Sequence, residues 1–100
     1  ETGIRDSFYR VKEQFIIRFR DQKFRYQAEV KPFSLDGKTI YEVYYSLVPY
    51  VHPARKVQVY PGSGHGRSVY WRQRITNQED ELLPQEFIEA IGNAIEQVSE

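Results

Sequence analysis

The sequence contains no cysteine and no methionine. Without cysteine the chain has no disulfide framework and no thiol chemistry, although this absence is compatible with any cellular compartment. Because the chain starts at Glu1 and has no methionine, we expect it to be a processed or excised piece from which a leader could have been removed. No apolar run approaches the roughly 20 residues that a membrane-spanning helix needs, so we expect no membrane span.

Motifs for catalysis and for metal binding are also missing. The run Gly62-Ser63-Gly64 is flanked by Pro61 and His65, where a nucleophile elbow requires glycines. The two histidines, His52 and His65, lie in separate predicted loops and lack the spacing of a metal site. We therefore predict a protein that is not an enzyme, with no catalytic residues, no metal and no cofactor.

The sequence does contain a clear alternation of apolar and polar residues. Between residues 24 and 30, aromatic or aliphatic side chains occupy the even positions and polar side chains the odd ones. A period of two is typical of a strand with one buried face and one solvated face. A chain of 100 residues is long enough for one core, so we predict a single domain over residues 1–100.

Two hairpins are predicted around this strand. Asp36-Gly37 favours a type I′ turn, and a hairpin centred there places Val30 opposite Val43. The apolar faces of the two strands then coincide, whereas a shift by one residue would separate them. An upstream hairpin centred on Asp21-Gln22 gives the same inner face and places Phe19 opposite Phe24.

The other elements follow from the same patterns. We predict strands over about 15–20, 23–31, 39–48, 55–60 and 68–75, and a helix from residue 83 or 84 to 98. Pro32 is expected to end or bulge the second strand. Ile75 should point inward, and Val98 should belong to the apolar stripe of the helix. Gly92 lies inside that helix, where glycine is unfavourable, and we attribute its presence to a close approach of the helix to the sheet.

Residues 1–13 fit either a helix or an extension of the first strand, and we favour the strand. The fold class predicted from all these elements is α+β: an antiparallel meander sheet of about five strands, with a C-terminal amphipathic helix packed on one face.

The aromatic content suggests a binding surface. Aromatic residues make up 15% of the chain, and a helix about 10–12 Å wide cannot cover a flat five-stranded sheet about 19 Å across. Unless the sheet curls strongly, an aromatic patch stays exposed on its inner face. We therefore predict a protein-interaction module that binds a protein partner or associates with itself, with a homodimer as one form.

Charge suggests an alternative, binding of single-stranded nucleic acid. All 14 Lys and Arg precede residue 75, whereas residues 79–100 carry seven acids and no base. The upstream hairpin places Arg18 opposite Arg25, and an anion would relieve their repulsion. The candidate binding residues on the outer sheet face are Arg18, Arg20, Arg25, Tyr70, Arg72 and Arg74. A weaker candidate is an anion-binding loop made of Gly62, Gly64, Gly66 and Arg67.

Overall fold

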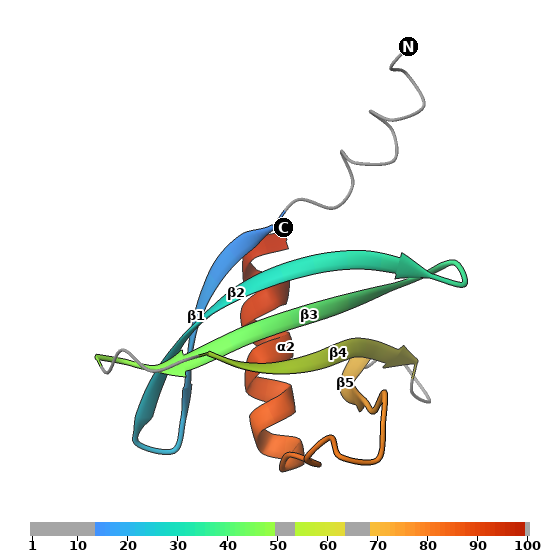
Figure 1. Cartoon of the computed structure of the whole chain (residues 1–100). Helices are drawn as coiled ribbons and strands as arrows, with labels where there is room; N and C mark the ends of the chain where they lie inside the picture. The colour runs from blue at the N-terminus through green and yellow to red at the C-terminus, as the bar shows by residue number, and fades with distance from the viewer. Residues whose placement is uncertain (1–13, 50–53, 64–68, 100) are drawn as a thin grey trace.

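The computed structural model describes residues 14–49, 54–63 and 69–99. These residues form one five-stranded antiparallel sheet in the order β1-β2-β3-β4-β5, followed by one helix (Figure 1). The elements are β1 (Phe15–Asp21), β2 (Phe24–Leu35), β3 (Lys38–Leu47), β4 (Arg55–Ser63), β5 (Val69–Arg74) and α2 (Gln85–Ser99). The predicted α+β meander with its C-terminal helix is confirmed. The prediction for residues 1–13 lies outside the described residues.

The hairpin between β2 and β3 has the predicted register. Asp36 has a φ of 53° and Gly37 a φ of 79°, as a type I′ turn requires. Val30 lies opposite Val43, and Lys31 lies opposite Glu42. The turn residues therefore set the pairing of the two longest strands.

Pro32 does not end β2, which continues to Leu35. With a two-residue turn, the Leu35–Lys38 pair exchanges hydrogen bonds, and hydrogen-bonded pairs then alternate with unbonded ones along the ladder. Pro32 and Tyr41 fall on an unbonded pair, so β3 does not need the N–H that proline lacks. The prediction was wrong because it did not consider which pairs of the ladder are hydrogen-bonded. Strand β4 also runs past its predicted end, to Ser63.

The hairpin between β1 and β2 has the predicted inner face but a different register. Its turn lies at Gln22 and Lys23, with Gln22 at a φ of 58°, so Phe19 lies opposite Tyr26 and not Phe24. A shift of two residues keeps every side chain on its face. It moves Phe24 to the end of the ladder, where its side chain is 44% exposed.

The sheet curls around α2. The helix packs against both edge strands, β1 and β5, and also against β4, and in Figure 1 it lies behind the sheet. One helix can reach both edges of a five-stranded sheet only if the sheet is strongly curved. Phe87 of α2 packs against the rings of Phe19, Tyr26 and Tyr45 at centroid distances of 5.1–5.4 Å. Curvature therefore covers most of the inner aromatic face.

Gly92 marks a close approach of α2 to the sheet, as predicted. A Cβ at this position would lie 2.0–2.2 Å from three atoms of the buried Trp71 indole. Two other predictions were wrong, because Ile75 is 45% exposed and Val98 is 50% exposed. Ile75 follows the end of β5, and Val98 lies in the last turn of α2, so neither is covered by the opposite layer.

Candidate functional site

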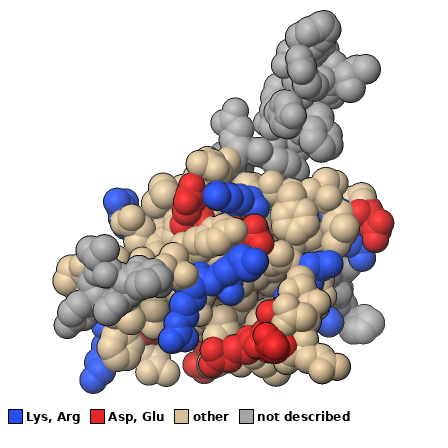
Figure 2. Space-filling view, in the orientation of Figure 1, with Lys and Arg blue, Asp and Glu red and all other residues tan. Residues whose placement is uncertain are grey.

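The charge of the sheet lies on the side turned away from α2, which we call the outer face. Figure 2 views this side, with Lys and Arg side chains across its middle. By strand alternation the outer face carries eight bases and two acids, a net charge of +6. The bases are Arg18, Arg20, Arg25, Lys31, Lys38, Lys56, Arg72 and Arg74, and the acids are Glu29 and Glu42. All of the bases except the partly buried Arg74 are exposed.

The arginines of the first hairpin do not pair as predicted. The two-residue shift places Arg20 opposite Arg25, and Arg18 opposite Gln27. Like charges still face each other across the strands, at a different pair. Among the described residues, no carboxylate lies within 4 Å of the guanidinium groups of Arg18, Arg20 or Arg25. These three arginines are therefore available to an external anion.

A polar row crosses the middle of the outer face. Glu42 accepts hydrogen bonds from Tyr44 Oη and Gln58 Nε2, both at 3.0 Å, and lies 3.7 Å from Lys56 Nζ. Arg74 Nη1 donates to Gln58 Oε1 at 2.6 Å. Burial raises the pKa of the Glu42 carboxyl, but these hydrogen bonds and the charge of Lys56 outweigh it, so the pKa lies below its ordinary value. Glu42 therefore stays ionised and fixes its neighbours.

Aromatic and basic side chains alternate at both ends of this row. Lys31 Nζ lies 5.0 Å from the centre of the Tyr44 ring. On β5, the guanidinium of Arg72 lies 4.9 Å from the centre of the Tyr70 ring and donates a hydrogen bond to its hydroxyl. Tyr60 of β4 lies opposite Arg72. The outer face thus brings together the predicted Tyr70 and Arg72, far along the sheet from Arg20.

The predicted anion-binding loop is only partly described. Gly62 lies in β4 and pairs with Tyr70. Gly64, Gly66 and Arg67 lie outside the described residues.

A groove opens on the inner face, where α2 begins. It has a volume of about 900 Å³ and a mainly apolar wall that includes Tyr26, Tyr45, Leu47, Leu83 and Phe87. It is the part of the inner aromatic face that the helix leaves uncovered. The predicted exposed aromatic patch is thus reduced to this groove and to Phe24, which lies beside the β1–β2 turn.

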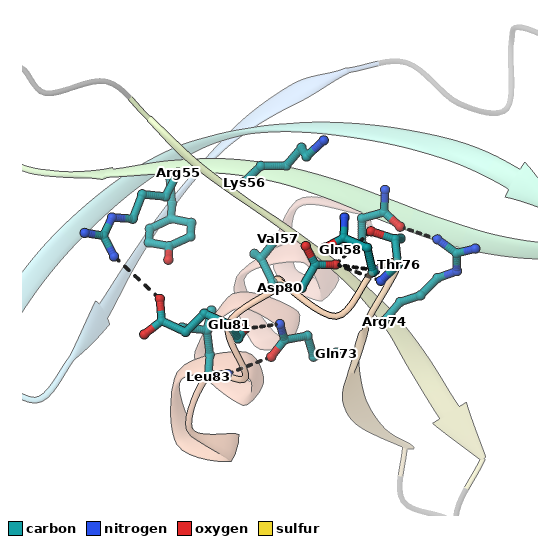
Figure 3. A pocket seen from close by; sticks show the side chains of 12 residues that line it. Arg55, Lys56, Val57, Gln58, Gln73, Arg74, Thr76, Asp80, Glu81 and Leu83 are labelled. Carbon is teal, nitrogen blue, oxygen red and sulfur yellow. Dashed lines mark hydrogen bonds and ion pairs between the residues drawn. The ribbon is translucent and has the colours of Figure 1, made fainter.

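A smaller polar pocket of about 130 Å³ lies between β4 and the segment 75–83 (Figure 3). The side-chain amide of Gln73 donates to the carbonyl of Glu81 at 2.7 Å and accepts from the N–H of Leu83 at 2.8 Å. The carboxylate of Asp80 accepts from the backbone N–H and the hydroxyl of Thr76, both at 2.7 Å. Because these groups satisfy one another, the pocket holds the connection to α2 in place and is a poor ligand site.

Sequence reasoning missed part of the outer face. Lys31, Lys38, Tyr44, Lys56 and Tyr60 belong to the same surface as the predicted arginines. The signal that could have found them is the alternation itself, once it is continued through every strand. Of these five residues only Lys38 lies outside the predicted strands, one residue before the third, because β3 begins at Lys38.

No cluster of three potential metal ligands occurs within residues 14–49, 54–63 and 69–99. The same part of the chain contains no helix with the length and apolarity of a membrane span. His52 and His65 lie outside the described residues. Comparisons with protein-family models, curated proteins and solved structures find no match to this chain.

Proposed function

We propose that this chain is a non-enzymatic binding module that holds an anionic polymer on the outer face of its sheet. The observation that supports this is the net charge of +6 on that face, in a chain whose total charge is zero. Within the described residues, Lys56 is the one outer-face base that lies within 4 Å of a carboxylate. Exposed Lys and Arg side chains that have no carboxylate beside them attract an anion, and dissolved salt weakens this attraction by screening it.

The helix makes the charge distribution directional. α2 carries three acids, Glu86, Glu89 and Glu96, and no base, and it lies on the opposite side of the sheet. An approaching polyanion is therefore repelled from one side and attracted to the other. Such an arrangement orients the encounter and raises the association rate more than it raises the final affinity.

The test is the salt dependence of binding to polyphosphate, poly-glutamate and an oligo-dT of about ten nucleotides. For oligo-dT, log K should fall linearly with log salt, with a slope of about −0.7 for each phosphate contacted. Arg25→Gln removes one outer-face charge and should make the slope less steep by about 0.7. Arg55→Gln is the matched control, because it removes one exposed charge on the inner side, near Glu81.

The proposal is wrong if none of the three polymers binds at about 50 mM salt, where phosphate contacts are strong. It is also wrong if Arg25→Gln and Arg55→Gln change the slope equally. That result would attribute binding to total charge and not to the outer face.

The inner groove supports a second candidate, binding of a protein chain. Tyr26, Leu47 and Phe87 offer it an apolar wall, and Phe24 is exposed nearby on the same sheet face. A second copy of this chain would be the simplest occupant, and a homodimer would lose stability on dilution. A strictly monomeric mass at high protein concentration would count against that form.

A further inference from the structure

The outer face carries exposed rings as well as charge. Four of its aromatic side chains are partly exposed: Phe33, Tyr44, Tyr60 and Tyr70. Tyr44 lies between Glu29 and Lys56 in the strand pairing. Charge alone would bind any polyanion. The exposed rings offer a second kind of contact, which a polyanion without flat groups of its own cannot make.

Two of these rings, Tyr60 and Tyr70, form a platform together with Arg72, where β4 ends and β5 begins. Arg72 lies opposite Tyr60 across the strands, over the ring of Tyr70 at 4.9 Å, and bonded to the Tyr70 hydroxyl. Planar rings and a planar guanidinium are the surfaces on which nucleobases stack. The platform therefore offers stacking and a positive charge at one place.

Gly62 allows this platform to form. A Cβ at Gly62 would lie 3.0 Å from Nε and 3.1 Å from Cδ of Arg72, so the Arg72 side chain occupies the space that a larger residue would fill. A hollow of about 650 Å³ adjoins it, lined in part by Lys38, Tyr60 and Arg72. That volume falls within the range of small-ligand clefts and is ample for a base.

A diagonal path connects the platform to the arginines of the first hairpin. Arg20 and Arg25 lie at the β1–β2 turn, Tyr44 lies mid-sheet under Lys31, and the platform lies at the far end of β4 and β5. Phosphate contacts and stacking surfaces thus follow one another along the face. An acidic peptide would pair with the Lys and Arg side chains but leave the aromatic rings without partners. A duplex would not stack on the rings either, because its nucleobases are already stacked on one another.

We infer that the anionic polymer is a single-stranded nucleic acid. Its nucleobases stack on Tyr44 and on the platform, and its phosphates contact the Lys and Arg side chains of the outer face. This inference rests on the proposed function and adds the class of ligand. Its distinguishing feature is a contribution of the bases that is separate from charge.

The experiment compares wild-type affinities for four probes at one salt concentration: oligo-dT, an abasic oligonucleotide of the same length, the corresponding duplex, and poly-glutamate. Each stacked base strengthens binding by about 5- to 100-fold, so oligo-dT should bind at least about fivefold more tightly than the abasic strand. It should also bind more tightly than the duplex and poly-glutamate. The inference is overturned if the abasic strand, the duplex or poly-glutamate binds as tightly as oligo-dT.

The two proposals fail separately in this experiment. Equal binding of all probes removes base stacking but leaves the polyanion site in place, whereas no binding of any probe removes both. A pair of variants adds a second test: Tyr60→Leu should weaken oligo-dT binding about 5- to 100-fold and leave abasic binding unchanged, while Tyr60→Phe should keep wild-type affinity. An equal loss for both probes in Tyr60→Leu would contradict a stacking role.

Discussion

Replacing Gly92 by alanine should destabilise the protein, although the same change stabilises an ordinary helix. In an exposed helix interior, alanine is favoured over glycine by about 1 kcal/mol. Here the added Cβ would lie 2.0–2.2 Å from three atoms of the Trp71 indole. Helix propensity and packing therefore predict opposite signs for the change in unfolding free energy.

The indole of Trp71 is not free to move away. It is 2% exposed, its Nε1–H donates to Glu96 at 3.1 Å, and the backbone N–H of Trp71 donates to Glu89 at 3.2 Å. Overpacking a tight core costs about 1–3 kcal/mol, and overlap with a fixed ring belongs at the upper end of that range. After the gain in helix propensity, we expect a net loss of about 2 kcal/mol, or about 8–16 °C in Tm for a domain of this size.

Urea unfolding followed by tryptophan fluorescence measures this directly, because Trp71 is the only tryptophan in the chain. Asn93→Ala is the control, since Asn93 is exposed on the same helix turn. This substitution should leave the free energy of unfolding unchanged or raise it slightly. A Gly92→Ala variant as stable as the wild type would refute the packing of α2 on β5 described above.

Three further changes test other parts of the account. Phe87→Ala removes a buried ring that contacts three other aromatic rings, and should cost about 3–5 kcal/mol in urea unfolding; less than 1 kcal/mol would contradict that packing. Hydrogen bonds from Thr76 lower the pKa of Asp80, so the stability it contributes is present above the unfolded pKa and lost as pH falls through the folded pKa. The Tm difference between the wild type and Asp80→Asn should therefore shrink below about pH 4, and a constant difference would argue against it. Glu29→Gln raises the outer-face charge to +7 and should tighten oligo-dT binding about two- to fivefold at low salt but not at about 1 M; unchanged binding at low salt would count against steering by this face.

Sequence reasoning succeeded where local chemistry determines the backbone. Asp36-Gly37 encodes two positive φ angles, and this turn fixed the register between β2 and β3. Gly92 could be interpreted because glycine is costly in a helix unless something lies close to it. In both places the residue has few alternative explanations.

It failed where several arrangements satisfy the same pattern. Alternation determines which face a residue lies on, but it does not distinguish registers that differ by two residues. Because Gln22 gives no strong turn signal, the prediction placed Arg18 opposite Arg25, whereas Arg20 lies there. The curl of the sheet and the hydrogen bonds of Glu42 depend on side chains far apart in sequence. No periodicity within a single element contains that information.

The most direct test of the binding face is the set of backbone amide NMR signals that shift when oligo-dT is added to the ¹⁵N-labelled protein. The account predicts shifts in β1 to β5, strongest near Arg20, Tyr44 and Arg72, with little change over Glu86–Glu96 of α2. Shifts confined to the groove around Tyr26 and Phe87, or to α2, would contradict it.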